Sequence, residues 1–163
     1  MVLEAFAYAR SKLMQDWKLV LVGVKGEFKP RLMREIKSRG LENDVICYGV
    51  VDEEMLLRVY QGASLYVDPT LYEGFGLQIL EAMKCGVPVI ASNTTSVPEI
   101  VGNAGILIDP RDTDGWKREM VRVLSSYSLR RKMRENGIKR ASEFTWEKTA
   151  KQILNGWHEL LKA

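Results

Sequence analysis

The sequence has little of what disulfides and metal sites require. Its 163 residues include two cysteines and a single histidine, His158. Neither a CxxC nor an HExxH pattern occurs, so we expect no metal bound by this protein. Cys47 and Cys85 stand at the ends of apolar segments, which favours two inert buried thiols, with a disulfide as the alternative. So few cysteines are typical of a reducing compartment, and we expect a cytoplasmic location.

Long apolar runs and strong charge are also missing. No stretch reaches the roughly 18 consecutive apolar residues that a membrane-spanning helix needs. The net charge of +3 is too small to argue for a nucleic-acid partner. With 46% hydrophobic and 28% charged residues the composition is that of an ordinary globular protein. We see no repeat, linker or low-complexity segment, and expect residues 1–163 to form a single domain.

Apolar segments of strand length alternate with segments of helical periodicity. Strands are expected at 18–23, 45–48, 65–67, 87–91 and 106–108, and helices at 3–14, 30–38, 53–60, 113–125, 129–144 and 146–161. Asp52 and Thr145 stand where helix caps belong. This alternation predicts an α/β fold, a Rossmann-like, mostly parallel sheet with helices on both faces and a helical C-terminal tail. The residues that follow strands should share one sheet edge, where ligands bind in such folds. They are Gly23, Gly49, Thr70 and Ser92.

The most informative segment is 73–81, where Glu73 and Glu81 enclose a glycine-rich turn at the start of a helix. Free N–H groups and the positive end of a helix dipole make such a junction a natural phosphate site. The alternative is that Gly74 and Gly76 only shape a tight turn. The two carboxylates lie about 12 Å apart if the interval is helical, wider than the roughly 5–10 Å of a glycosidase pair. They therefore suit two parts of one ligand. The expected phosphate donors are the N–H groups of Phe75, Gly76 and Leu77.

This segment resembles the E-x7-E signature of the family 4 retaining glycosyltransferases, which have the GT-B fold. Further landmarks of that family occur in the right order: Leu-Val-Leu-Val-Gly at 19–23, Tyr-Gly-Val-Val at 48–51, Gly-Val-Pro-Val-Ile-Ala-Ser at 86–92, Val-Pro-Glu-Ile-Val at 97–101 and Gly-Ile-Leu-Ile-Asp-Pro at 105–110. The resemblance implies the C-terminal, nucleotide-sugar-binding half of a hexosyltransferase. It would move a hexose from a UDP or GDP sugar to an alcohol acceptor, and hold no permanent cofactor.

The resemblance also implies roles for individual residues. Glu73, the catalytic candidate, would lie at the sugar hydroxyls and orient the anomeric carbon; the alternative is an ordinary loop carboxylate. Glu81 shares a helical face with apolar neighbours, so we expect it to be partly buried. It would grip the ribose diol, or else bind a backbone or hydroxyl partner within the protein. Gly23 is a further candidate for the donor site. The nucleobase would be bound by the main chain of four residues, Tyr48, Gly49, Val50 and Val51; the alternative is that these four residues only end a strand.

Three serine and threonine residues depart from the family pattern. Thr94, Thr95 and Ser96 stand where the family has a glycine pair before Pro-Glu. Their hydroxyls would replace close backbone approach as ligand contacts.

In the resembled mechanism the leaving diphosphate takes the acceptor's proton, so the protein mainly positions groups and stabilises charge.

The resemblance further implies parts that residues 1–163 do not contain. The family has a central strand before the first helix, with an Arg and a Lys facing the diphosphate, and a whole acceptor-binding half. We therefore expect a gap in the sheet or direct pairing across it, and no transfer by this chain alone. The missing half, or a partner chain, would supply the acceptor site and any peripheral membrane contact. The last helix, which crosses to that half in the family, should be weakly anchored and drive weak self-association.

Two other functions are weighed against a transferase. One is a non-catalytic nucleotide-sugar-binding subunit of a split enzyme, which a co-purifying partner would favour. The other is a Rossmann-like dinucleotide-binding protein. No G-x-G-x-x-G follows the first strand, which disfavours that reading.

Overall fold

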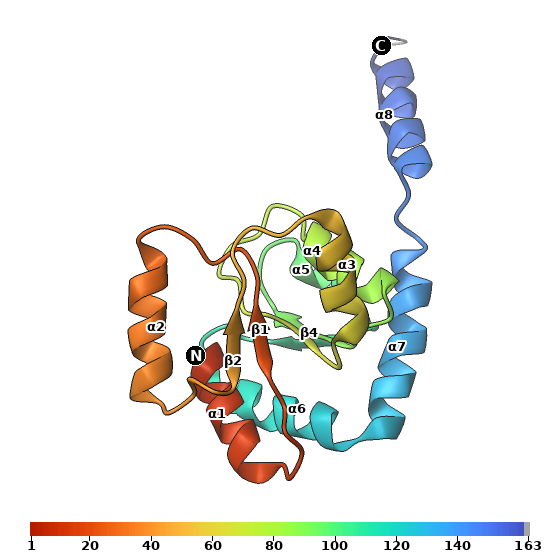
Figure 1. Ribbon diagram of the computed structural model, residues 1–163. Helices are drawn as coiled ribbons and strands as arrows, with labels where there is room; N and C mark the ends of the chain where they lie inside the picture. The colour runs from red at the N-terminus through yellow and green to blue at the C-terminus, as the bar shows by residue number, and fades with distance from the viewer. Residues whose placement is uncertain (162–163) are drawn as a thin grey trace.

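The computed structural model describes residues 1–161, which form eight helices and five short strands (Figure 1). In chain order these are α1 (Val2–Lys12), β1 (Leu19–Leu21), α2 (Phe28–Ser38), β2 (Val45–Cys47), α3 (Glu53–Gly62), β3 (Tyr66–Asp68), α4 (Leu77–Lys84), β4 (Val89–Ser92), α5 (Val97–Val101), β5 (Ile106–Ile108), α6 (Thr113–Ser125), α7 (Tyr127–Ala141) and α8 (Trp146–Leu160). The alternation of strands and helices confirms the predicted α/β class.

The strand β4 is the centre of the larger sheet, whose order is β3-β4-β5 with all strands parallel. All four residues of β4 are buried, and successive side chains point to opposite faces. Ile90 packs into one hydrophobic cluster, which includes Phe6 and the fully buried Trp116. Val89 and Ala91 pack into a second cluster with residues of α3, α4 and α5. This sheet therefore carries helices on both faces, as predicted.

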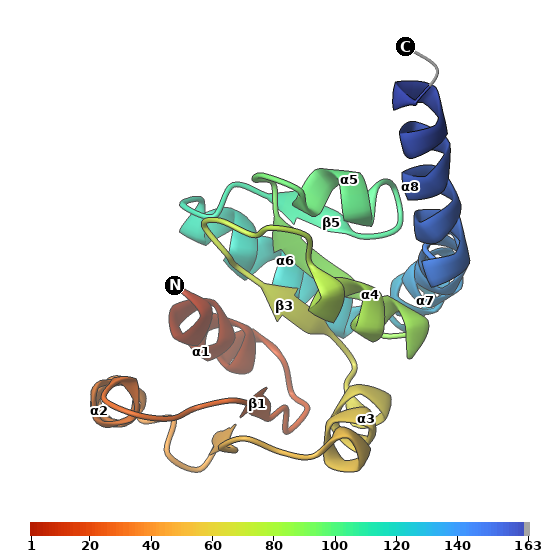
Figure 2. The same cartoon turned by 90° about the horizontal axis from the view of Figure 1, so that it is seen from above.

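The remaining two strands, β1 and β2, form a separate parallel pair. The pair stands upright in Figure 1, where β4 lies across the view, and β1 is seen nearly end-on in Figure 2. The sequence predicted one sheet with either a gap or direct pairing, and the described residues have the gap. Leu19 and Leu21 pack on the cluster below α1, whereas Val20 is 37% exposed on the opposite face. The continuous apolar run at 18–23 predicts a buried parallel strand. This prediction is wrong, because only one face of β1 is covered.

The helix ends follow local chemistry. The side chain of Asp52 accepts a hydrogen bond from the N–H of Met55 at 2.8 Å, and that of Thr145 accepts one from Lys148 at 3.2 Å. Both predicted caps are confirmed. The first helix ends two residues earlier than expected, and Met14, which the expected range 3–14 included, is fully exposed.

Cys47 and Cys85 are free thiols and half-buried, so the disulfide alternative is wrong. Along residues 1–161 no helix has the length and apolar character that crossing a bilayer requires.

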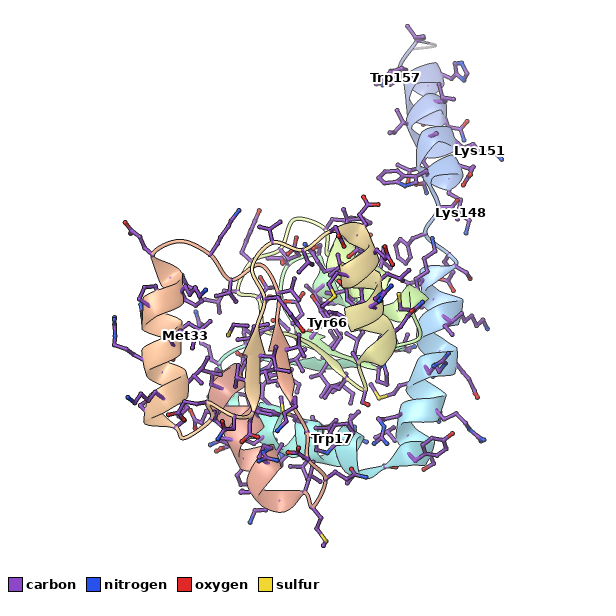
Figure 3. All side chains as sticks on the ribbon, in the orientation of Figure 1. Trp17, Met33, Tyr66, Lys148, Lys151 and Trp157 are labelled. Atoms are coloured by element: carbon purple, nitrogen blue, oxygen red, sulfur yellow. The ribbon has the colours of Figure 1, made fainter. Side chains whose placement is uncertain are left out.

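The last helix, α8, leads away from the other elements (Figures 1 and 2). None of its residues is buried, although its apolar positions repeat at helical spacing. Trp157 is 62% exposed and extends from the helix into open space (Figure 3). The predicted weak anchoring is confirmed, since no side chain of α8 enters either hydrophobic cluster. Self-association through this helix stays a prediction.

We predict that deleting residues 146–163 leaves the free energy of unfolding within about 0.5 kcal/mol of the full chain, as expected for changes outside the core. Urea unfolding of the two chains measures the difference. Sedimentation velocity of the same samples tests association, which should weaken in the shortened chain. A loss of several kcal/mol on deletion would mean that α8 packs on its own domain.

Candidate functional site

The loop that carries Glu73 folds back on itself between β3 and α4. The Glu73 carboxylate oxygen Oε1 accepts hydrogen bonds from the N–H groups of Gly74 at 3.0 Å and Phe75 at 3.4 Å. The carboxylate thus occupies a place where an anionic ligand could bind the same amides. Of the expected phosphate donors, Phe75 is therefore already engaged, by a carboxylate of its own loop.

The N-terminus of α4 offers donors one residue further along. Gly76 caps this helix with a φ of 102°, a conformation that suits glycine. Within the described structure the N–H groups of Gly76, Leu77 and Gln78 donate to no protein acceptor. Gln78 was missed by the sequence analysis, although a count of the orphan amides at a helix start would include it. Three such amides at the positive end of a helix dipole are able to bind an anion.

Two hydroxyls from the loop after β4 brace the Glu73 loop. The N–H of Glu73 donates to Thr95 Oγ1 at 3.1 Å. The Ser96 hydroxyl lies 2.9 Å from the Glu73 carbonyl and 3.2 Å from the Phe75 carbonyl. These hydroxyls therefore hold the site's own backbone, whereas contacts to the ligand were predicted for them from the sequence. Thr95 adopts a φ of 50°, the one non-glycine residue with positive φ in the described chain.

A second brace lies at the ends of β3 and β4. The buried hydroxyl of Ser92 donates to the main-chain carbonyls of Asp68 and Thr70, which holds the start of the same loop. The Asp68 side chain accepts from the N–H of Thr70 at 3.2 Å. Burial raises the pKa of Asp68; the Thr70 hydrogen bond opposes the rise, and the negative charge of Glu73 adds to it. Thr70 and Ser92 thus lie at one edge of the larger sheet, as predicted. Gly23 and Gly49, predicted at the same edge, instead follow the strands of the separate β1-β2 sheet.

Glu81 is exposed on α4, so the prediction that it is partly buried is wrong. The residue one turn before it, Leu77, is itself half-exposed, and its face of the helix is open. The Glu81 carboxylate accepts a hydrogen bond from the Tyr60 hydroxyl, at 3.0 Å to Oε2. The predicted alternative of a hydroxyl partner is therefore present, and among the described residues the other oxygen, Oε1, has no protein donor.

The loop ends of β1 and β2 meet at the smaller sheet. Gly23, with a φ of 81°, donates its N–H to the Gly49 carbonyl at 3.0 Å, and Val24 donates to the Tyr48 carbonyl at 3.0 Å. These carbonyls are therefore engaged within the protein. The main chain of Val50 and Val51 is left for a ligand, and Val50 is 77% exposed.

The structure thus brings the site candidates together in two groups. Glu73 to Glu81 lie with the loop after β4, and Gly23 lies with Gly49 at the other sheet. Across residues 1–161 no hydrogen bond joins the two groups, and no cluster of three His, Cys, Asp or Glu side chains has metal-ligand geometry.

The model of the family described as glycosyl transferases group 1 matches residues 1–140. The chain belongs to this family. The O-antigen chain mannosyltransferase B of Escherichia coli is 37% identical over 157 residues, which are 96% of this chain and 41% of the relative. The chain therefore spans less than half the length of that relative. The finding confirms the family predicted from the E-x7-E segment.

Two solved structures have the same fold as this chain. Sucrose-phosphate synthase from Thermosynechococcus elongatus is 30% identical with a TM-score of 0.83, over 98% of this chain and 42% of that one. A C-terminal domain of a glycosyl transferase group 1 family protein from Francisella tularensis is 28% identical with a TM-score of 0.74, over 86% of this chain and 77% of that one. These similarities confirm the Rossmann-like GT-B architecture.

We predict that Gly76→Ala lowers the free energy of unfolding by about 1–2 kcal/mol, the usual cost of a left-handed non-glycine residue. A Cβ there would also lie 3.3 Å from Ile79 Cδ1. Gly74→Ala is the matched control, since a Cβ at position 74 meets nothing within 4 Å. Urea unfolding of both variants measures the difference, and equal stabilities would contradict the strained turn.

We predict that Asp68→Asn is more stable than the native chain at pH 7. The pKa of this carboxyl is higher in the folded state than in the unfolded state. At a pH between these two pKa values the folded chain binds more protons than the unfolded chain, so the free energy of unfolding falls as the pH rises through that interval. The neutral amide avoids this loss, and its advantage should shrink toward pH 4.

Asp109→Asn is the control for this pH dependence. Asp109 follows β5 and accepts the N–H two residues on, from Arg111 at 2.8 Å, but its side chain is exposed. Removing its charge relieves no burial, so thermal unfolding at the two pH values should separate the variants. A stability advantage for Asp109→Asn as large as that for Asp68→Asn would contradict the role of burial.

Proposed function

We propose that this chain is the donor-binding domain of a retaining glycosyltransferase. The parent reaction is transfer of a hexose from a nucleoside-diphosphate sugar to an alcohol acceptor. The observation that carries the proposal is the free N-terminus of α4, whose three unpartnered amides lie between Glu73 and Glu81. An anion held there has a carboxylate on each side, able to bind hydroxyls rather than phosphate oxygens.

The diphosphate binds at the amides of Gly76, Leu77 and Gln78. Its oxygens compete with the Glu73 carboxylate for the N–H groups of Gly74 and Phe75. Displaced from them, Glu73 turns to the hydroxyls of the sugar and orients the anomeric carbon. The braces at Thr95 and Ser96 keep the loop in place during this exchange, which limits the ordering cost of binding.

The nucleoside lies on the other side of the phosphates. Glu81 accepts hydrogen bonds from the two ribose hydroxyls, and the main chain of Val50 and Val51 contacts the base. Gly23, Tyr48 and Gly49 shape this edge through the hydrogen bonds between their loops. A main-chain contact to the base suits either a uracil or a guanine nucleotide.

The acceptor site belongs to a region outside residues 1–163 or to a partner chain. Relatives more than twice as long as this chain support that division. Transfer needs an acceptor held against the sugar in a water-poor cleft, which one open sheet edge does not provide. Because relatives such as the Escherichia coli protein are named mannosyltransferases, mannose is the first hexose to test.

The test is a titration of the isotope-labelled chain, followed by NMR, with UDP, GDP and their glucose and mannose esters. We expect weak binding, with shifts concentrated at 50–51 and 73–81. Affinity should be low because residues 1–163 do not include the Arg and Lys that face the diphosphate in the resembled family. The loss of each such charge-assisted contact weakens the affinity by about 10-fold to 150-fold. Added magnesium ions should not be required.

The matched control is the corresponding nucleoside, which lacks the diphosphate and should bind far more weakly. Saturable nucleotide binding without shifts at 73–81 would overturn the placement. Preference for a nicotinamide dinucleotide over every nucleoside diphosphate would overturn the proposed function itself.

A further inference from the structure

We propose that Tyr60 positions the nucleotide ribose by fixing the carboxylate of Glu81. The inference rests on the proposed function, in which Glu81 accepts the ribose hydroxyls. Tyr60 lies on α3 and Glu81 on α4, 21 residues apart in sequence. Their hydrogen bond of 3.0 Å is a link between two helices at the point where the donor would bind.

The donor end of this link is rigid. Tyr60 is only 8% exposed and belongs to the hydrophobic cluster beneath α3 and α4. Its ring packs against the ring of Tyr66, with the ring centroids 6.0 Å apart and the ring planes tilted by 55°. Tyr66 is labelled in Figure 3. The hydroxyl also approaches the main-chain carbonyl of Gln78 at 3.5 Å. The buried ring keeps its hydroxyl beside these two acceptors, of which Glu81 is the nearer.

Among the described residues the acceptor end has only this one hydrogen-bond partner. Glu81 is exposed, and an exposed glutamate loses substantial rotamer freedom when a ligand fixes it. Tyr60 holds one oxygen, Oε2, and leaves Oε1 and the second lone pair of Oε2 for two ribose hydroxyls. Part of the ordering cost is thus met before the ligand arrives.

The direction of the hydrogen bond is fixed as well. Burial raises the pKa of the Tyr60 hydroxyl, and the negative charge of Glu81 raises it further. The phenol therefore stays protonated and remains the donor. Glu81 stays an acceptor, which is the role that hydroxyl ligands need.

A purely structural role for the bond is the alternative, since it also joins α3 to α4. The two roles differ in what they do to selectivity. A structural bond supports all nucleotide binding alike, whereas a positioning bond matters only to ligands that have ribose hydroxyls.

The experiment compares a ribonucleoside diphosphate with its 2′,3′-dideoxy analogue, using UDP or GDP, whichever the chain binds more tightly. Tyr60→Phe should weaken ribonucleotide binding by about twofold to tenfold, the cost of ordering one side chain, and leave the analogue unchanged. Glu81→Ala should abolish the preference for the ribonucleotide. In the double variant, Tyr60→Phe should add no further loss, because it acts through Glu81.

Tyr66→Phe is the matched control. It removes a hydroxyl from the neighbouring ring of the same cluster, which makes no hydrogen bond to Glu81 within the described structure. It should leave the preference intact. Thermal unfolding of each variant confirms that the fold is retained, as expected when a single oxygen atom is lost.

The outcomes separate the inference from the function on which it rests. A native chain that binds both nucleotides equally well contradicts the placement of Glu81 and the inference together. A preference that Glu81→Ala removes and Tyr60→Phe leaves untouched overturns the inference alone. Equal losses for both nucleotides in Tyr60→Phe assign the bond a structural role and overturn it too.

Discussion

The burial of β4 is the constraint on which the rest of the structure depends. This strand pairs on both edges and packs on both faces, so its four residues have no contact with water. Two hydrophobic clusters meet across it, one below α1 and α6 and one below α3, α4 and α5. The loop that leaves β4 begins from this fixed strand and carries Thr95 and Ser96, which hold the Glu73 loop. Strand burial and site geometry are therefore parts of one arrangement.

The site combines fixed main chain with side chains that each have a partner already. Glu73 is held by amides of its own loop and Glu81 by a buried phenol. Neither carboxylate is left to sample solvent freely, which limits the entropy that a ligand must remove. The free amides at the start of α4 differ from them, because helix geometry itself leaves them unsatisfied. A bound anion would give these amides the acceptor that the described protein residues do not provide.

Much of the fold could be predicted from local chemistry. Helix caps depend on the residues within one turn, which is why Asp52 and Thr145 were placed correctly. Apolar runs located all five strands to within two residues, since β propensity and burial coincide there. The prediction that β1 is buried was wrong, because burial depends on which neighbouring elements cover a strand, and one face of the β1-β2 pair is open.

The site was predicted less completely, and for a similar reason. The prediction of a phosphate site rests on residues that lie within one segment, the glutamates and glycines of 73–81. Contacts between residues that are far apart in the sequence produce no comparable sequence pattern. Tyr60 has the spacing of a core residue, and nothing in the sequence shows that its hydroxyl reaches Glu81. Thr95 and Ser96 were predicted to contact the ligand. Their observed role depends on the position of the Glu73 loop, which lies 22 residues earlier in the sequence than Thr95, and the sequence does not show that position.

The isolation of α8 has a mechanical consequence. The helix joins the rest of the described chain only through residues 142–145, so its direction is set by a few backbone dihedral angles. Its 15 residues span about 22 Å, and a small rotation in that connection moves its tip by many ångströms. A short tether also keeps the apolar stripe at an effective concentration of about millimolar to any surface within reach. A rotation in that connection would therefore change where the apolar stripe of α8 points, and no residue of α8 is buried to oppose it.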